Sequence, residues 1–365
     1  MSQMDVVALI RIAKSKNASD LHLTVGSPAM LRVHGELVPA EDEIPLTPED
    51  MQEAFDQMTT EDEKAEFQKN KELDLGYSVP GLVRIRCNAA WQRGTISLAM
   101  RLVANTIPDI DTLQIPEICK NLILKPRGML VISGPTGSGK STTLAAMIDY
   151  LNQRESRRIV TIEDPIEYVY TSKRCAITQR ELGSDTHSFA DALRHVLRQD
   201  PDVILVGEMR DLETASAALT IAETGHLLLT TGHAPSTYQA IERIIDMFPP
   251  HERALAQSRL ASLLIGILCQ ALVPKIDGQG RLPAVEIMLA NPAVRNLIRE
   301  GKIHQLPNAI RTHARMGMQL LDQALVNLHK NGVISTENVY AFCNDREEVE
   351  KLMASIEDKL VAASL

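Results

Sequence analysis

The sequence predicts an α/β protein with two domains, and three observations support this prediction. The chain has 365 residues, which is longer than a single hydrophobic core usually supports. Its first hundred residues combine helical segments with strands in which apolar and polar residues alternate. From about residue 117 on, short strands that are apolar throughout alternate with helices, as in a mainly parallel sheet covered on both faces.

The N-terminal domain is expected over residues 1–102 as a small α+β unit. Val7, Ile10 and Ala13 have the spacing of one face of an opening helix. A second helix begins at Thr47, which can cap it, with Pro48 in the first helical position. Strands are predicted at 20–24, 29–35 and 82–90. In the last of these strands, Arg84 and Arg86 share one face.

Residues 103–116 contain two X-Pro breaks and are interpreted as a linker. The C-terminal domain is expected over 117–365, with a helical region from about residue 291. Its apolar strands are predicted at 128–133, 157–163, 202–207 and 226–231.

Two apolar segments follow these strands. Residues 260–274 are predicted to form a buried helix, because they fall short of the roughly 20 residues needed to cross a bilayer. Any contact with a membrane is therefore expected to be peripheral. Residues 272–288 are interpreted as a hairpin that turns at 277–280. A helix is then expected from Pro292, with Val294, Leu297 and Ile298 on its apolar face and Arg295, Arg299 and Glu300 facing away.

Composition excludes several classes of protein. The formal net charge of −9 disfavours broad nucleic-acid binding, which needs a basic surface. No two of the five cysteines have metal-ligand spacing, so neither a zinc site nor a disulfide framework is predicted. The charged opening segment does not have the pattern of a signal peptide. A cytoplasmic protein with reduced thiols is expected.

The strongest motif is a phosphate-binding loop between the strand at 128–133 and a helix. It consists of Gly134, Pro135, Thr136, Gly137, Ser138, Gly139, Lys140 and Ser141, with Thr142 following in the helix. The glycines let backbone N–H groups surround phosphates at the helix N-terminus. Lys140 is expected to neutralise the β- and γ-phosphates and Ser141 to bind Mg²⁺. The sequence therefore predicts binding of a nucleoside triphosphate.

Acidic residues follow two of the predicted strands. Glu208 ends one strand, where its carboxylate could hold Mg²⁺ or polarise the attacking water. Glu163, Asp164 and Glu167 end another, and one of them could act as a general base. A solvated turn is the alternative interpretation of these three acids. Open α/β sheets bind ligands at this edge.

The motifs together resemble those of secretion ATPases. The phosphate-binding loop, "TIEDPIE", "DPDVILVGEMRD" and "AETGHLLLTTGH" occur in the order of the Walker A motif, Asp box, Walker B motif and His box. "ASDLHL" near the N-terminus and residues 293–310 resemble the PilT-type pilus retraction ATPases more specifically. The resemblance implies a PAS-like N-terminal domain, a RecA-like C-terminal domain, and a hexamer that binds ATP between the two.

The resemblance also assigns roles to residues. Lys140 and Ser141 bind phosphate and Mg²⁺, Glu208 is the Walker B acid, and Glu167 is the base for water, with Glu163 a lesser candidate. Three arginines of the N-terminal domain are expected to reach nucleotide, namely Arg84, Arg86 and Arg101. His226 and His233 become the His box, which senses the γ-phosphate. As metal ligands the two histidines lack partners nearby in the sequence, and magnesium prefers oxygen.

The His box departs from the family pattern. The family usually has Thr-Leu-His-Thr where this chain has Thr231, Gly232, His233 and Ala234. The change removes an apolar anchor and a hydroxyl, so weaker hydrogen bonding near the phosphates is expected.

The expected function is that of a hexameric motor at the inner face of the cytoplasmic membrane. ATP hydrolysis would drive pilus retraction through an inner-membrane platform protein, with a second pilus ATPase as a further partner. One alternative is a PilU-type accessory ring that binds nucleotide and modulates a partner motor. Another is a related ATPase of secretion or DNA uptake, which the acidic charge disfavours.

Overall fold

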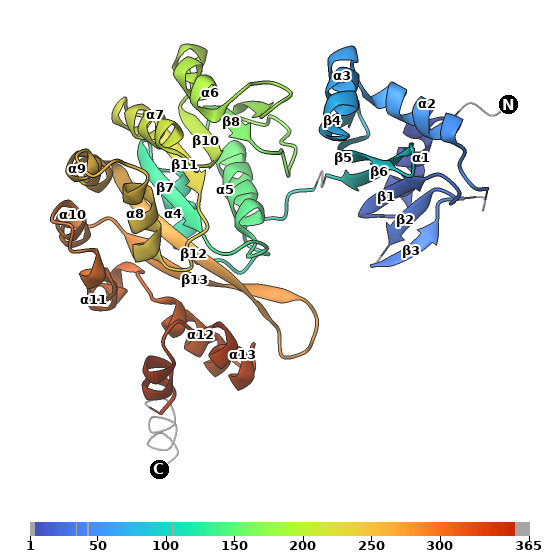
Figure 1. Ribbon diagram of the computed structural model, residues 1–365. Coiled ribbons are helices and arrows are strands. Elements are labelled where there is room, and N and C mark those ends of the chain that lie inside the picture. The colour runs from blue at the N-terminus through green and yellow to red at the C-terminus, as the bar shows by residue number, and fades with distance from the viewer. Residues whose placement is uncertain (1–3, 34, 42–43, 104–105, 355–365) are drawn as a thin grey trace. The chain divides into compact units, whose positions relative to one another are not determined.

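The computed structural model describes residues 4–33, 35–41, 44–103 and 106–354. The chain divides into two compact units (Figure 1). The first reaches to Thr106 and includes the short segment Pro165–Val169, and the second comprises the remainder from Ile107 on. Part of the predicted linker packs inside the second unit, because Ile110 is buried in its core.

The first unit contains a six-stranded antiparallel sheet in the order β3-β2-β1-β6-β5-β4. The strands are β1 (Asp20–Thr24), β2 (Met30–Val33), β3 (Glu36–Pro39), β4 (Glu72–Val79), β5 (Val83–Gln92) and β6 (Thr95–Leu102). The helices are α1 (Val6–Ser15), α2 (Pro48–Met58) and α3 (Glu61–Asn70). Helices and strands share one apolar core.

Local signals explain several of these elements. Thr47 caps α2 as predicted, and the Asp50 side chain bonds back to the backbone of Thr47. Along β5, Val83 and Ile85 are buried, whereas Arg84 and Arg86 lie on the other face, which confirms the predicted alternation. In α1 the buried face contains Val6 in place of Val7.

The second unit contains a seven-stranded sheet in the order β13-β12-β7-β11-β10-β8-β9, and among its described strands only β13 is antiparallel to its neighbour. The strands are β7 (Gly128–Ser133), β8 (Arg158–Glu163), β9 (Ala176–Glu181), β10 (Val203–Glu208), β11 (Leu227–Thr231), β12 (Leu264–Pro274) and β13 (Arg281–Leu289). The four predicted apolar strands are confirmed to within one residue at each end.

Helices cover both faces of this sheet. Alternate strand residues enter different cores: Met129 and Val131 pack with α6 to α9, whereas Leu130 and Ile132 pack with α4 and α5. The helices are α4 (Ile118–Ile123), α5 (Lys140–Arg154), α6 (Phe189–Val196), α7 (Leu212–Glu223), α8 (Thr237–Asp246) and α9 (Arg253–Leu263). This arrangement explains why the strands are apolar throughout.

The helix predicted over 260–274 is wrong for most of its length. Only the end of α9 is helical, and the chain continues as β12 from Leu264. A continuous apolar run suits a buried strand as well as a buried helix. Here β12 pairs with β7 on one side and with β13 on the other, and Pro274 opposite Arg281 closes the predicted hairpin.

Arg295 was expected to face away from the apolar side of its helix, but its side chain instead contacts the end of α9. The helical region contains α10 (Pro292–Arg299), α11 (Leu306–Thr312), α12 (Leu321–Lys330) and α13 (Thr336–Phe342). The Arg295 guanidinium in α10 donates to the carbonyls of Ala261 and Ser262 at 2.6 Å and of Leu264 at 2.8 Å. These bonds satisfy carbonyls that a helix end leaves without partners. In the described ranges, no helix is both long and apolar enough to span a membrane.

Candidate nucleotide-binding and hydrolysis site

The phosphate-binding loop joins β7 to α5 at the carboxyl edge of the sheet. Gly134, Gly137 and Gly139 have positive φ angles of 141°, 77° and 87°. A Cβ at Gly134 would lie 2.3 Å from the carbonyl oxygen of Gln270, so only glycine fits there. The loop thus takes a conformation that directs backbone N–H groups toward a bound anion.

Gln270 on β12 anchors this loop, and sequence reasoning missed it. Its amide nitrogen donates to the carbonyl of Ser138 at 2.7 Å, and its amide oxygen accepts from the Thr143 hydroxyl at 2.8 Å. Gln270 is buried. A single amide within the apolar run 264–273 was the available signal.

The loop fits a phosphate ligand. Lys140 Nζ donates to the carbonyls of Gly134 and Pro135 at 2.8 and 3.0 Å, so the ammonium lies over the loop. The buried Ser138 hydroxyl has no hydrogen-bond partner within the described chain. Ser141 and Thr142 lie half-buried in the first turn of α5, where the helix dipole favours negative charge.

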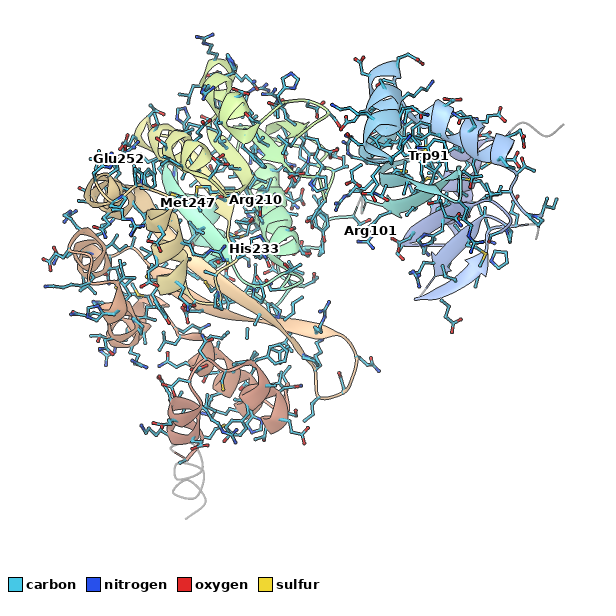
Figure 2. The ribbon with its side chains drawn as sticks, viewed as in Figure 1. Trp91, Arg101, Arg210, His233, Met247 and Glu252 are labelled. Carbon is cyan, nitrogen blue, oxygen red and sulfur yellow. The ribbon has the colours of Figure 1, made fainter. Side chains whose placement is uncertain are left out.

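A carboxylate–imidazole pair lies beside this loop. Glu208 ends β10 and is 8% exposed, and its Oε2 is 2.9 Å from Nε2 of His233, which follows β11. Arg210, which Figure 2 labels together with His233, contacts the other carboxylate oxygen and lies 3.8 Å from Asp164. Burial lowers the pKa of His233, and the charges of Lys140, Arg243 and Arg210 lower it further. A neutral imidazole can donate its Nε2–H to Glu208 and leave the carboxylate charge intact.

Backbone hydrogen bonds hold the loop that carries His233. The Ser133 hydroxyl accepts from Ala234 N at 2.9 Å and donates to Ala234 O at 2.8 Å. The Thr231 hydroxyl donates to the carbonyl of Gly207. The end of β7 is therefore joined to the His box although residue 234 has no hydroxyl of its own.

His226 lies away from this edge of the sheet, and its predicted role at the γ-phosphate stays a prediction. His226 precedes β11, and its Nδ1 is 2.9 Å from the Thr224 hydroxyl. His233 follows the same strand. The two histidines therefore lie at opposite ends of a buried strand.

The remaining candidates stay predictions. Glu163 accepts hydrogen bonds from the Thr161 hydroxyl at 2.6 Å and from the Gln179 amide at 3.1 Å. Glu167 belongs to the segment that groups with the first unit. The nucleotide contacts of three arginines of the first unit also stay predictions. Arg84 donates to the Ser78 hydroxyl at 2.8 Å, and Arg101 pairs with Asp20 at 2.9 Å. The third, Arg86, is exposed.

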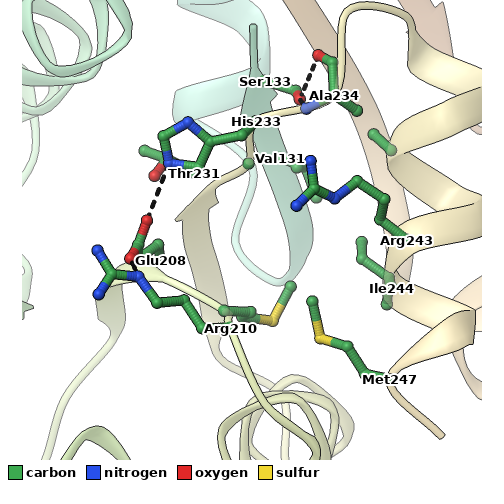
Figure 3. A pocket seen from close by; sticks show the side chains of 13 residues that line it. Val131, Ser133, Glu208, Arg210, Thr231, His233, Ala234, Arg243, Ile244 and Met247 are labelled. Carbon is green, nitrogen blue, oxygen red and sulfur yellow. Dashed lines mark hydrogen bonds and ion pairs between the residues drawn. The ribbon is translucent and has the colours of Figure 1, made fainter. Parts of the chain in front are cut away.

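Two pockets adjoin the loop and the pair. A pocket of about 160 Å³ lies on the α5 side of the loop, lined by Gly139, Thr142, Leu272 and Leu282 among others. A cavity of about 280 Å³ lies behind Glu208 and His233, between the ends of β7, β10 and β11 and helix α8 (Figure 3).

Comparisons with known proteins agree with this geometry. The chain is 44% identical over 339 residues to the "Type IV pilus retractation ATPase PilT" of Pseudomonas aeruginosa, covering 92% of this chain and 97% of that protein. It is 39% identical to the "Type IV pilus ATPase PilU" of the same organism, covering 96% and 91%.

A solved structure of the pilus retraction motor PilT with bound ADP matches with a TM-score of 0.87 and 43% identity, covering 95% of this chain and 99% of that one. The ATPase DotB of Legionella pneumophila matches with a TM-score of 0.81 and 29% identity, covering 91% and 93%. Residues 7–364, nearly the whole chain, match the family described as "Type II/IV secretion system protein". With its phosphate-binding loop, Walker B acid and His box in that order, this chain belongs to the family of type II/IV secretion system proteins.

Proposed function

We propose that this chain is a motor of the PilT type, which hydrolyses ATP to retract a type IV pilus. One observation carries the proposal: Glu208 and His233 meet at the sheet edge, tied through Ser133 to the strand that leads into the glycine loop. The 44% identity to a pilus retraction ATPase and the fold shared with an ADP-bound retraction motor support it.

The nucleotide would bind along the loop and α5. Its phosphates would occupy the cradle formed by Gly134 to Gly139, where Lys140 would exchange its two carbonyl contacts for phosphate oxygens. Its ribose and base would extend toward the smaller pocket lined by Thr142 and Leu272.

Hydrolysis needs an activated water and stabilisation of the leaving group. The water oxygen bonds to the γ-phosphorus while the bond from that phosphorus to the β,γ-bridging oxygen breaks, which gives ADP and phosphate. The water loses a proton to a carboxylate, and the family resemblance favours Glu167 for this role. Ser141 and Glu208 offer the oxygen ligands that Mg²⁺ prefers, and the bound ion would neutralise phosphate charge.

His233 would position the Glu208 carboxylate. Because burial and then the surrounding cations keep its pKa low, the imidazole stays neutral at pH 7 and donates a hydrogen bond without cancelling the charge of Glu208. Loss of the γ-phosphate would alter the charges around this pair, which is a route from nucleotide state to loop position.

The proposal extends to the assembly. Six chains would form a ring at the cytoplasmic face of the inner membrane and act on a platform protein of the pilus, with a second pilus ATPase as a further partner. Arg84, Arg86 and Arg101 would supply positive charge to nucleotide at the junctions of the ring.

Steady-state ATP hydrolysis by the purified oligomer tests the proposal. Glu208→Gln should reduce magnesium-dependent turnover by at least about a hundredfold, since removal of one electrostatic contact to a transition state commonly costs that much. Glu337→Gln, at an exposed position of α13, is the matched control and should leave turnover unchanged.

One observation favours a second candidate. Gly232 and Ala234 change the His box, and the chain is also 39% identical to PilU over 96% of its length. An accessory ring would bind ATP tightly without turning it over alone and would gain activity only with a partner motor. That outcome would replace the motor proposal.

A further inference from the structure

The cavity behind Glu208 and His233 has a buried inner end and an exposed mouth (Figure 3). Ser133 and Val131 line the inner end and are fully buried, and Ser133 directly precedes the first glycine of the phosphate-binding loop. Arg210 and Arg243 are exposed and line the outer part. The cavity thus extends from the region expected for the γ-phosphate toward solvent. Its volume of about 280 Å³ suits a small ion and not a second nucleotide.

Gly232 leaves this space open. Its φ lies outside the left-handed region, so its backbone does not require glycine. A Cβ there would lie 3.2 Å from the Ser133 hydroxyl and 4.0 Å from a methyl group of Val131, two residues of the cavity wall. Any larger side chain at this position would therefore project into the cavity or displace its wall.

Arg243 places a positive charge in the cavity, and the proposed hydrolysis does not use this side chain. Arg210 is paired with Glu208 and Asp164, whereas Arg243 has no hydrogen bond or ion pair to any described residue. Its guanidinium points from α8 into the cavity (Figure 3). A guanidinium with five N–H donors in a planar fork is well suited to bind a phosphate.

We propose that this cavity is the exit site for inorganic phosphate, which Arg243 draws away from the γ-position after hydrolysis. The inference deepens the proposed ATPase function and rests on it. Part of the wall is apolar, with Ile244 and Met247 facing the space (Figure 3). Glu208 and Arg210 also line the cavity, but they are paired with each other. The one lining guanidinium that is not paired with a described carboxylate, that of Arg243, would bind the ion briefly and then release it, as an exit requires, whereas several such cations would retain it.

Single-turnover kinetics separate cleavage from release. ATP and magnesium are mixed with the purified oligomer, cleavage is followed by acid quench, and free phosphate is followed in parallel by a fluorescent phosphate sensor. Arg243→Gln should leave cleavage unchanged and slow release about tenfold, which corresponds to about 1.4 kcal/mol. Arg243→Lys, which keeps the charge, should restore most of the rate. Added phosphate should inhibit the Gln variant less than the wild type.

Two further variants sharpen the test. Gly232→Leu, which fills the cavity, should also delay release while cleavage persists. Arg198→Gln removes an exposed arginine outside the cavity and should change neither step. Release that keeps pace with cleavage in both Arg243→Gln and Gly232→Leu would overturn the inference, as would a loss of cleavage itself in Arg243→Gln. Absence of cleavage in the wild type would instead refute the proposed ATPase function.

Discussion

Replacing Gln270 with leucine should loosen the phosphate-binding loop, because this side chain joins the loop to β12. Leucine has a similar size and suits the apolar run, so the change mainly removes two hydrogen bonds, at 2.7 Å to the carbonyl of Ser138 and at 2.8 Å from the hydroxyl of Thr143. Both partners are only 3% exposed, so water cannot readily replace the amide.

The magnitude follows from these contacts. A buried polar group left without its partner costs about 1–3 kcal/mol, so the two groups together should lower the free energy of unfolding by about 2–6 kcal/mol. For a domain of this size, each kcal/mol shifts the midpoint of thermal unfolding by about 2–4 °C, which predicts a fall of about 4–24 °C. The loop also loses its fixed shape, so we expect the affinity for ATP to fall at least about tenfold.

Thermal unfolding followed by circular dichroism and calorimetric titration with a non-hydrolysable ATP analogue measure the two effects. Gln279→Leu is the matched control, because Gln279 lies at the exposed hairpin tip and its side chain makes no hydrogen bond to any described residue. An ATP affinity equal to that of the wild type, with an unchanged unfolding midpoint, would refute the anchoring role of Gln270.

Three further predictions concern the loop, the His box and the end of α9. Gly134→Ala should abolish nucleotide binding measured by calorimetry, because its Cβ would meet the Gln270 carbonyl at 2.3 Å; retained binding would contradict the assigned loop geometry. His233 has a lowered pKa, so below its usual value of about 6.5 the unfolded state takes up the proton more readily, and its contribution to stability falls as the pH falls. The free energy of unfolding should therefore decline less steeply between about pH 7 and pH 5 in His233→Gln than in the wild type. Chemical denaturation at several pH values measures this decline, and equal slopes for the two proteins would count against the prediction. Arg295→Met should cost about 2–4 kcal/mol in the same assay, since three carbonyls near the end of α9 lose a charged donor; a cost below about 1 kcal/mol would show that water replaces it.

Sequence reasoning succeeded where the signal is local. The strand, glycine loop and helix around Lys140 follow from neighbouring residues, because the loop needs glycine and both flanking elements have clear periodicity. The same holds for the hairpin that Pro274 and Arg281 close.

Sequence reasoning failed where pairing between distant segments decides which secondary structure forms. The run 260–274 suits a helix or a strand, and β12 forms because β7 and β13 supply backbone partners while Arg295 satisfies the end of α9.

The His box also connects to the C-terminal helices through a buried acid. Glu286 on β13 is 2% exposed and accepts from the backbone and hydroxyl of Thr237, both at 2.7 Å, and from the backbone of Leu321 at 3.1 Å. Thr237 begins α8, three residues after Ala234, and Leu321 begins α12, so one carboxylate caps two helices. A shift of the His233 loop that moves the start of α8 must therefore carry α12 with it or break hydrogen bonds to a buried carboxylate. Because an unpaired buried carboxylate is costly, the first outcome is favoured, and such a shift at the nucleotide site would be transmitted to the helical region.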